Sequence, residues 1–300
     1  MWFHLFGCFT ESNGVGMRWE GQRESDNIED RRGMGPARIG GLGLGGLVLV
    51  LAVSYFTGAN PLTLINMLNG VQSMTESSAP PEPGPTGPPS DQLGKFASVV
   101  LADTETTWNA LLGQRYENPH MVLFSGAVHS ACGTTSSAVG PFYCPGDHKL
   151  YLDLSFFDEM SKRLGAPGDF AQAYVIAHEV GHHVQNLLGI AEKVTRLQRQ
   201  VSEKEHNALS VRMELQADCF AGVWGHHAKR ERNLIEPGDF EEGLRAASAI
   251  GDDRLQKMAR GHVQPESWTH GSSEQRMTWL KRGLETGDPN VCDTFSNNRL

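Results

Sequence analysis

The sequence predicts an α+β protein, in which a small β-sheet is followed by a mostly helical half and preceded by one N-terminal transmembrane helix. Residues 121–128 and 149–157 have the apolar content expected of strands, and the second segment alternates with polar residues. From Phe170 onward, apolar residues recur every three or four positions, as on the buried face of a helix. Residues 39–56 form an uncharged stretch of 18 residues, which is the length that spans a bilayer. Strands that precede a run of helices are typical of the α+β class.

The apolar stretch is interpreted as a membrane anchor at residues 39–57. A cleaved signal peptide would have a shorter apolar core, and a glycine-rich loop would not contain seven consecutive Leu, Val and Ala residues at 47–53. Five arginines lie in residues 1–38, and no lysine or arginine follows the anchor before Lys95. By the positive-inside rule, we expect residues 1–38 in the cytoplasm and the bulk of the chain outside the membrane.

A linker and a single domain follow the anchor. Six prolines between residues 79 and 90 disfavour helix and strand, so residues 58–90 are expected to form a semi-rigid linker. Residues 91–300 then form the domain. Its helices are expected at residues 93–112, 170–190, 191–230, 240–260 and 273–283. The 39% apolar content supports one sizeable core, and the formal net charge of −9 argues against a nucleic-acid partner.

The most specific motif is His-Glu-Val-Gly-His-His at residues 178–183. His178 and His182 are four residues apart, so they project from the same face of a helix. This spacing lets two imidazoles bind one Zn²⁺. Glu179 is then free to take a proton from a water molecule at the open position of the metal, as in zinc peptidases. Gly181 is expected to leave room beside the metal.

A third ligand is expected at Glu214, which lies 32 residues after His182. This distance lets the chain turn and return a second helix beside the first, and a carboxylate often completes a catalytic zinc site. Asp218 shares the helix face of Glu214 and is expected to accept the remaining N–H of a ligand histidine. A carboxylate pair at this spacing is usually a solvated helix face, but the largely apolar residues 215–223 favour burial. We therefore expect one zinc ion per chain, bound by His178, His182 and Glu214.

Four segments carry a family resemblance. They are HEVGHHVQ at residues 178–185, ELQADCFAGVW at 214–224, GPFYCP at 140–145 and MRWEGQRESDNIEDRRG at 17–33. Together they resemble the bacterial putative neutral zinc metallopeptidases, which are membrane-anchored proteins of the gluzincin type. The resemblance implies a zincin-like fold and a zinc peptidase. In a bacterium, the anchor would lie in the inner (cytoplasmic) membrane and the domain in the periplasm or outside. Residues 1–16 lie outside the resemblance, and our hypothesis is that translation begins at Met17.

A further catalytic residue is implied by residues 268–276, WTHGSSEQR, which are similar to a Thr-His-Pro…Arg segment of related membrane-linked gluzincins. In those proteins, a histidine that follows the zinc-binding glutamate donates a hydrogen bond to the developing oxyanion. The resemblance implies this role for His270, although Gly271 stands where that pattern has proline. The alternative is a surface or capping histidine beside the helix of residues 273–283. His183 is expected to be structural, because neighbours on a helix point apart.

Four cysteines lie in the expected exported domain, namely Cys132, Cys144, Cys219 and Cys292. In an oxidising compartment, an even number of cysteines suggests two disulfides, for which three pairings can be formed. We favour Cys132–Cys144, which closes a short loop, and Cys219–Cys292, which joins the C-terminal tail to the helix of Glu214. Zinc binding by the cysteines is the competing interpretation, but the chain contains no Cys-x-x-Cys.

The sequence thus predicts a zinc-dependent peptidase that acts on peptides or proteins outside the membrane. An edge strand at residues 149–157, or residues 142–144 before it, is expected to bind the substrate backbone by β-addition; an internal strand without a substrate role is the alternative. Two other functions are a catalytically silent zinc-binding scaffold and a membrane-anchored structural protein without metal. Glu179 argues against the scaffold, because a structural zinc has no use for a base. The sequence does not indicate an oligomeric state.

Overall fold

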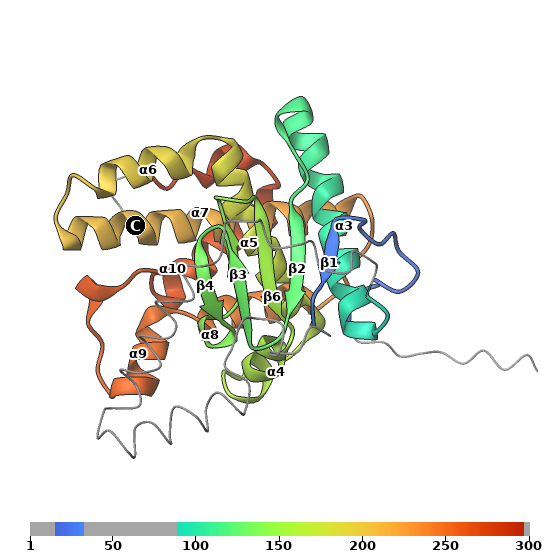
Figure 1. Ribbon diagram of the computed structural model, residues 1–300, viewed down its shortest axis with the longest axis horizontal. Coiled ribbons are helices and arrows are strands. Elements are labelled where there is room, and N and C mark those ends of the chain that lie inside the picture. Colours follow the sequence, from blue (N-terminus) through green and yellow to red (C-terminus); the bar gives the residue numbers. More distant parts are fainter. Residues whose placement is uncertain (1–15, 33–88, 297–300) are drawn as a thin grey trace, which may run out of the picture.

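The computed structural model describes residues 16–32 and 89–296 (Figure 1). Over these residues the α+β class is confirmed, with a small mixed sheet followed by a mostly helical half. The main sheet has the strand order β1-β2-β6-β5, with β1, β2 and β6 parallel and β5 antiparallel to β6. Its strands are β1 (Ile28–Asp30), β2 (His120–Phe124), β5 (Phe142–Cys144) and β6 (Lys149–Asp153). A separate hairpin is formed by β3 (Ala127–Ser130) and β4 (Gly133–Ser136).

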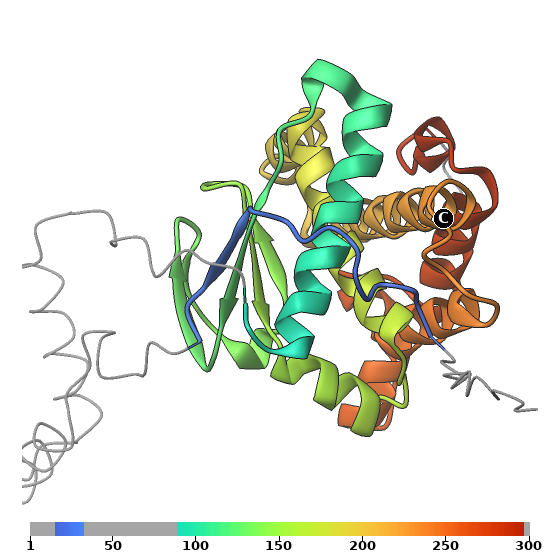
Figure 2. The same ribbon diagram turned by 90° about the vertical axis from the view of Figure 1, so that its right-hand side faces the viewer.

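Helix α5 is the centre of the helical half. It contacts β5 and α3 on one side and α7 and α8 on the other. Figure 2 shows the sheet on one side of the molecule and α7 and α10 on the opposite side. The α-helices of the described residues are α3 (Gln92–Leu112), α4 (Ser155–Lys162), α5 (Asp169–Leu187), α6 (Ile190–Gln198), α7 (Glu203–Arg230), α8 (Asp239–Ala249), α9 (Asp252–Arg260) and α10 (Ser273–Thr286).

Local capping divides elements that the apolar pattern joined. The expected helix of residues 191–230 is two helices, because the Ser202 side chain accepts the N–H of Glu205 in a capping box that starts α7. The expected helix of residues 240–260 is also two, and Gly251 precedes the second. The expected strand of residues 149–157 ends early, because Asp153 accepts the N–H of Ser155 at the start of α4. Hydrogen bonds of single side chains thus set these boundaries.

Helices α7 and α10 pack with their backbones in close contact. A Cβ atom on Gly283 of α10 would lie 2.0 Å from the carbonyl oxygen of Cys219 in α7. The Cys219–Cys292 disulfide links α7 to the turn that follows α10, and the Cys132–Cys144 disulfide links the β3–β4 hairpin to β5. Both pairings favoured from the sequence are therefore confirmed.

Residues 16–32 are part of the packed domain. β1 extends the main sheet by pairing with β2, and the backbone N–H of Arg18 donates to the carbonyl oxygen of Leu234 at 2.8 Å. Arg32 forms an ion pair with Asp91, on the far side of the stretch between the two described ranges. The sequence predicted a cytoplasmic segment separate from the domain. These contacts instead require residues 16–32 and 89–296 to lie in one compartment.

The expected anchor at residues 39–57 and nearly all of the linker at residues 58–90 lie outside the described residues. Among the helices of residues 16–32 and 89–296, none is both long enough and apolar enough to cross a membrane. The anchor and the compartment of the domain therefore stay predictions.

Candidate metal centre

Two histidines of α5 and a glutamate of α7 converge on one point. His178 Nε2 lies 3.1 Å from Glu214 Oε2, and His182 Nε2 lies 3.3 Å from Glu214 Oε1. The two imidazole rings meet edge to face, with their centroids 4.8 Å apart. One donor atom from each residue lies within 4.8 Å of the other two. The structure thus brings together the three residues that the sequence proposed as metal ligands.

This donor set fits a zinc ion. Ligand atoms about 2.0–2.1 Å from a tetrahedral centre are about 3.3 Å from one another, which agrees with the two separations to Glu214. Two imidazoles and a carboxylate are a ligand set of catalytic zinc sites, which keep the fourth position open. The side chains of His182 and Glu214 are 19% and 18% exposed, so the centre is accessible from solvent.

Each histidine is oriented by a hydrogen bond from its other ring nitrogen. Nδ1 of His178 lies 2.8 Å from Asp218 Oδ1, and Nδ1 of His182 lies 2.9 Å from Gln185 Oε1. Both oxygens accept, so Nδ1 carries the proton in each neutral ring and Nε2 keeps its lone pair. Both Nε2 atoms face Glu214. Gln185 was not singled out from the sequence, although it lies within the segment HEVGHHVQ.

Asp218 is fixed by a buried network. Arg276 of α10 donates from Nε and Nη2 to the two carboxylate oxygens of Asp218, each at 2.9 Å. The Tyr174 hydroxyl donates to Asp218 Oδ1 at 2.6 Å and accepts from Arg276 Nη2 at 3.2 Å. All three side chains are almost completely buried. Tyr174 and Arg276 were missed by the sequence reasoning. Tyr174 lies one helical turn before His178, and this spacing was the signal that could have identified it.

The carboxylates determine the protonation of the metal-free centre. Burial lowers the pKa of His178, but Asp218 and Glu214 outweigh burial and raise this pKa to about 10. Burial also lowers the pKa of His182, and the Glu214 carboxylate again raises it above its ordinary value. Burial raises the pKa of Glu214, but the two histidines hold it well below its usual range. A metal must therefore displace protons from the imidazoles, and its affinity rises with pH.

Gly181 allows the two ligand helices to approach each other. A Cβ atom at this position would lie 2.9 Å from the carbonyl oxygen of Ala217 in α7. The sequence predicted that Gly181 leaves room for the metal, but the backbone of α7 occupies that room. Because Ala217 lies between Glu214 and Asp218, the close contact is what brings both carboxylates to the histidines of α5.

Glu179 is the carboxylate beside the centre that has no other role. It is partly buried on α5 and lies close enough to His182 to raise the pKa of that histidine. Among the described residues, it has no hydrogen-bond or ion-pair partner. It is therefore available to accept a proton.

His270 lies on the loop before α10 and is held by Asp252 of α9. Asp252 Oδ2 accepts the backbone N–H groups of Thr269, His270 and Gly271 at 2.7–3.0 Å, and its Oδ1 lies 3.2 Å from His270 Nδ1. The hydrogen bond to Asp252 raises the pKa of His270, and the charge of Glu214 raises it further. The ring is 52% exposed. The structure thus places His270 on the solvent side, within the electrostatic influence of the centre.

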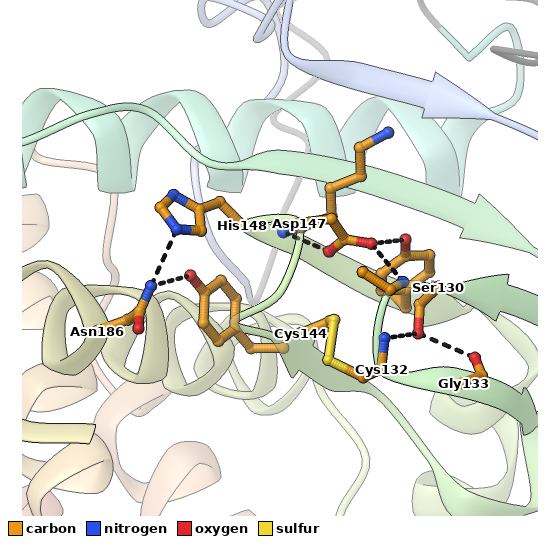
Figure 3. The surroundings of a disulfide bond; sticks show 11 residues. Ser130, Cys132, Gly133, Cys144, Asp147, His148 and Asn186 are labelled. Atoms are coloured by element: carbon orange, nitrogen blue, oxygen red, sulfur yellow. Dashed lines mark hydrogen bonds between the residues drawn. A yellow bond between two sulfur atoms is a disulfide. The ribbon is translucent and has the colours of Figure 1, made fainter. Parts of the chain in front are cut away.

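His183 points away from the ligands and joins α5 to the sheet. Its Nε2 donates to the carbonyl of Glu117 at 2.7 Å, and its Nδ1 accepts from the Tyr143 hydroxyl at 3.0 Å. Burial lowers the pKa of His183 to about 4, so the ring is neutral. Asn186 donates to the same hydroxyl and contacts His148, as Figure 3 shows beside the Cys132–Cys144 disulfide. These contacts fix β5 against α5.

The strand expected to bind substrate is narrowed to one segment. β6 lies between β2 and β5, so the expected edge at residues 149–157 is wrong. β5, formed by residues 142–144, ends the main sheet on the side of α5. The internal position of β6 could not be derived from its apolar alternation, which is the same for edge and central strands.

Comparison with known proteins identifies the family. Residues 17–295 match the family model described as putative neutral zinc metallopeptidase. The chain belongs to this family. The uncharacterized protein YpfJ of Escherichia coli K12 is 50% identical over 293 residues, which cover 93% of this chain and 99% of YpfJ. The uncharacterized protein Rv2575 of Mycobacterium tuberculosis H37Rv is 48% identical over 202 residues, which cover 64% of this chain and 67% of that protein. No solved structure matches the chain.

Proposed function

We propose that this member of the putative neutral zinc metallopeptidase family is a zinc-dependent peptidase that hydrolyses peptide bonds of peptides or proteins outside the cytoplasmic membrane. The observation that carries the proposal is the convergence of His178, His182 and Glu214 beside the unpaired carboxylate of Glu179. Three protein ligands and a neighbouring base are typical of catalytic zinc, whereas structural zinc has four protein ligands.

The residues divide the chemistry between them. Zinc bound by His178, His182 and Glu214 supplies a Lewis acid that polarises the scissile carbonyl and makes water more acidic. Glu179 accepts the proton of the attacking water and returns it to the leaving amine nitrogen, so that one C–O bond forms as the C–N bond breaks. His270, held by Asp252, donates to the oxygen that becomes negatively charged.

Substrate binding is assigned to the free edge of β5. An extended peptide beside an edge strand is held by main-chain hydrogen bonds. β5 is joined to α5 through Tyr143, whose hydroxyl contacts His183 and Asn186. A peptide at this edge would therefore run along the helix that carries two of the metal ligands.

The compartment is proposed from the cysteines and the expected anchor. Two disulfides are typical of an oxidising compartment. With the anchor of residues 39–57 in the inner membrane of a bacterium, the domain would act in the periplasm or outside the cell. Residues 16–32 would lie in the same compartment, because they pack on the domain.

The function is tested by incubating the full-length, zinc-loaded protein with a library of unfolded peptides. We expect cleavage that is abolished by a zinc chelator and restored by added Zn²⁺. The His178→Ala variant should cleave no peptide, because it lacks a ligand. If the zinc-loaded wild-type protein leaves the whole library intact, the proposal of a peptidase is contradicted and the zinc-binding scaffold is favoured.

A further inference from the structure

Three carboxylates meet at the N-terminal end of α5, the helix that carries His178 and His182. Asp169 is the first residue of α5, and Asp239 and Glu242 lie in the first turn of α8. One oxygen atom from each of the three lies within 4.8 Å of the other two. We call this group the acidic pocket. It is separate from the metal centre, which lies further along α5.

The acidic pocket lacks a counter-charge among the described residues. Asp169 Oδ1 and Glu242 Oε2 are buried and have no hydrogen-bond partner there. Lys229 and Arg245 lower the pKa values of Asp239 and Glu242 from a distance, but neither forms an ion pair with the pocket. Burial and mutual repulsion raise these pKa values overall, that of Asp239 to about 6. Buried carboxylates this close together require a cation.

The backbone nitrogen of Met17 reaches the pocket. It donates to Asp169 Oδ2 at 2.8 Å. The Met17 side chain is buried in the core, and the next backbone N–H, that of Arg18, is bonded to Leu234. The position of the Met17 nitrogen is therefore fixed from both sides. A Cβ atom on Gly16 would lie 2.7 Å from Asp169 Oδ2, so the chain before Met17 runs directly against the same carboxylate.

A peptide nitrogen at this position supplies a single proton and no net charge. An α-ammonium group at the same position supplies three donors and a positive charge, which matches a pocket with several unsatisfied oxygen atoms. The family match begins at the same residue, Met17. Arg18 follows it, and a methionine before such a large residue is not removed by methionine aminopeptidases, which require a small second residue.

We propose that the working protein begins at Met17 and that its α-ammonium group is the cation of the acidic pocket. This ion pair joins the N-terminal segment to the first residue of the metal-binding helix. It holds residues 17–32, including β1, on the domain and closes the N-terminal end of α5. The proposal does not depend on the peptidase function, because each of its tests has a physical readout.

The first test compares two full-length chains, one that begins at Met1 and one that begins at Met17. Asp169→Asn is introduced into both, and Asp158→Asn, an exposed residue of α4, is the matched control. We expect Asp169→Asn to lower the Tm of the Met17 chain by about 5 °C more than that of the Met1 chain. Asp158→Asn should change neither Tm by more than about 1 °C. An equal effect of Asp169→Asn in both chains would overturn the proposal.

The second test needs no substitution. The α-amine of the folded Met17 chain is acetylated near neutral pH, and its rate is compared with that of the same chain in denaturant. We expect at least about a ten-fold slower reaction in the folded protein, because the amine is paired with buried carboxylates. Equal rates would show a free amine and overturn the proposal. A rise of Tm on addition of Ca²⁺ to the Met17 chain would also overturn it, because the pocket would then be a metal site.

Discussion

Glu179→Gln is expected to lower kcat by about 10²–10⁴-fold, which is the contribution of a general base in catalysis. Glutamine has the shape of glutamate but cannot accept a proton from water. Since the Glu179 carboxylate forms no hydrogen bond with other described residues, its replacement breaks no structural contact. The variant should therefore keep its zinc and its stability. Peptide cleavage, zinc content and Tm are measured on the same preparation.

The matched control for this prediction is Glu203→Gln. Glu203 is an exposed residue at the start of α7, away from the capping interaction of Ser202 with Glu205. It should retain full activity. Wild-type turnover in a zinc-loaded Glu179→Gln protein would show that another group takes the proton and would refute the assigned mechanism.

Arg276→Met is expected to reduce the free energy of unfolding by about 3–5 kcal/mol. The guanidinium of Arg276 pairs with both oxygens of Asp218, and both side chains are nearly inaccessible to solvent. Methionine fills much of the space but leaves the Asp218 carboxylate buried without its counter-charge. Because Asp218 orients His178, zinc affinity should also fall by about 10–100-fold. Denaturant unfolding of the metal-free protein measures the first effect, and competition with a chelator measures the second.

Two comparisons make this prediction specific. Lys281→Met, at an exposed position of the same helix, should change the free energy of unfolding by no more than about 0.5 kcal/mol. The double variant Arg276→Met/Asp218→Asn should be more stable than Arg276→Met alone, because it removes the unpaired charge. Equal stability of Arg276→Met and Lys281→Met would mean that the buried pair does not hold α10 to the metal centre.

The metal ligands could be proposed from sequence because their geometry is local. His178 and His182 are related by one helical turn, and so are Glu214 and Asp218, so each pair shares a face wherever its helix lies. The convergence of the two helices could only be expected. Its physical cause, the contact of Gly181 with Ala217, became visible only in the fold.

The supporting residues could not be predicted because they depend on packing between distant elements. Arg276 reaches Asp218 across 58 positions of sequence, and only the close packing of α10 on α7 brings them together. β1 is three residues long, too short for a periodic signal, and its partner β2 lies far along the chain. The sequence therefore placed residues 16–32 in a separate segment, whereas non-local pairing joins them to the sheet.

The helix boundaries were missed for a different reason. Apolar periodicity continues through the breaks near Ser202 and Gly251, because both halves bury a face against the same core. A single side-chain hydrogen bond or a glycine ends the helix without interrupting that pattern. By contrast, the pairing of the cysteines followed from how far apart they lie and was confirmed.

The central claim is that His178, His182 and Glu214 bind one catalytic zinc ion. The most direct test is the zinc content of the purified full-length protein, measured by elemental analysis for the wild type and for Glu214→Gln. We expect about one zinc per chain in the wild type and a large loss in the variant, because two histidines alone do not complete the site. A wild-type protein without zinc, or a Glu214→Gln protein with its full zinc content, would contradict this account.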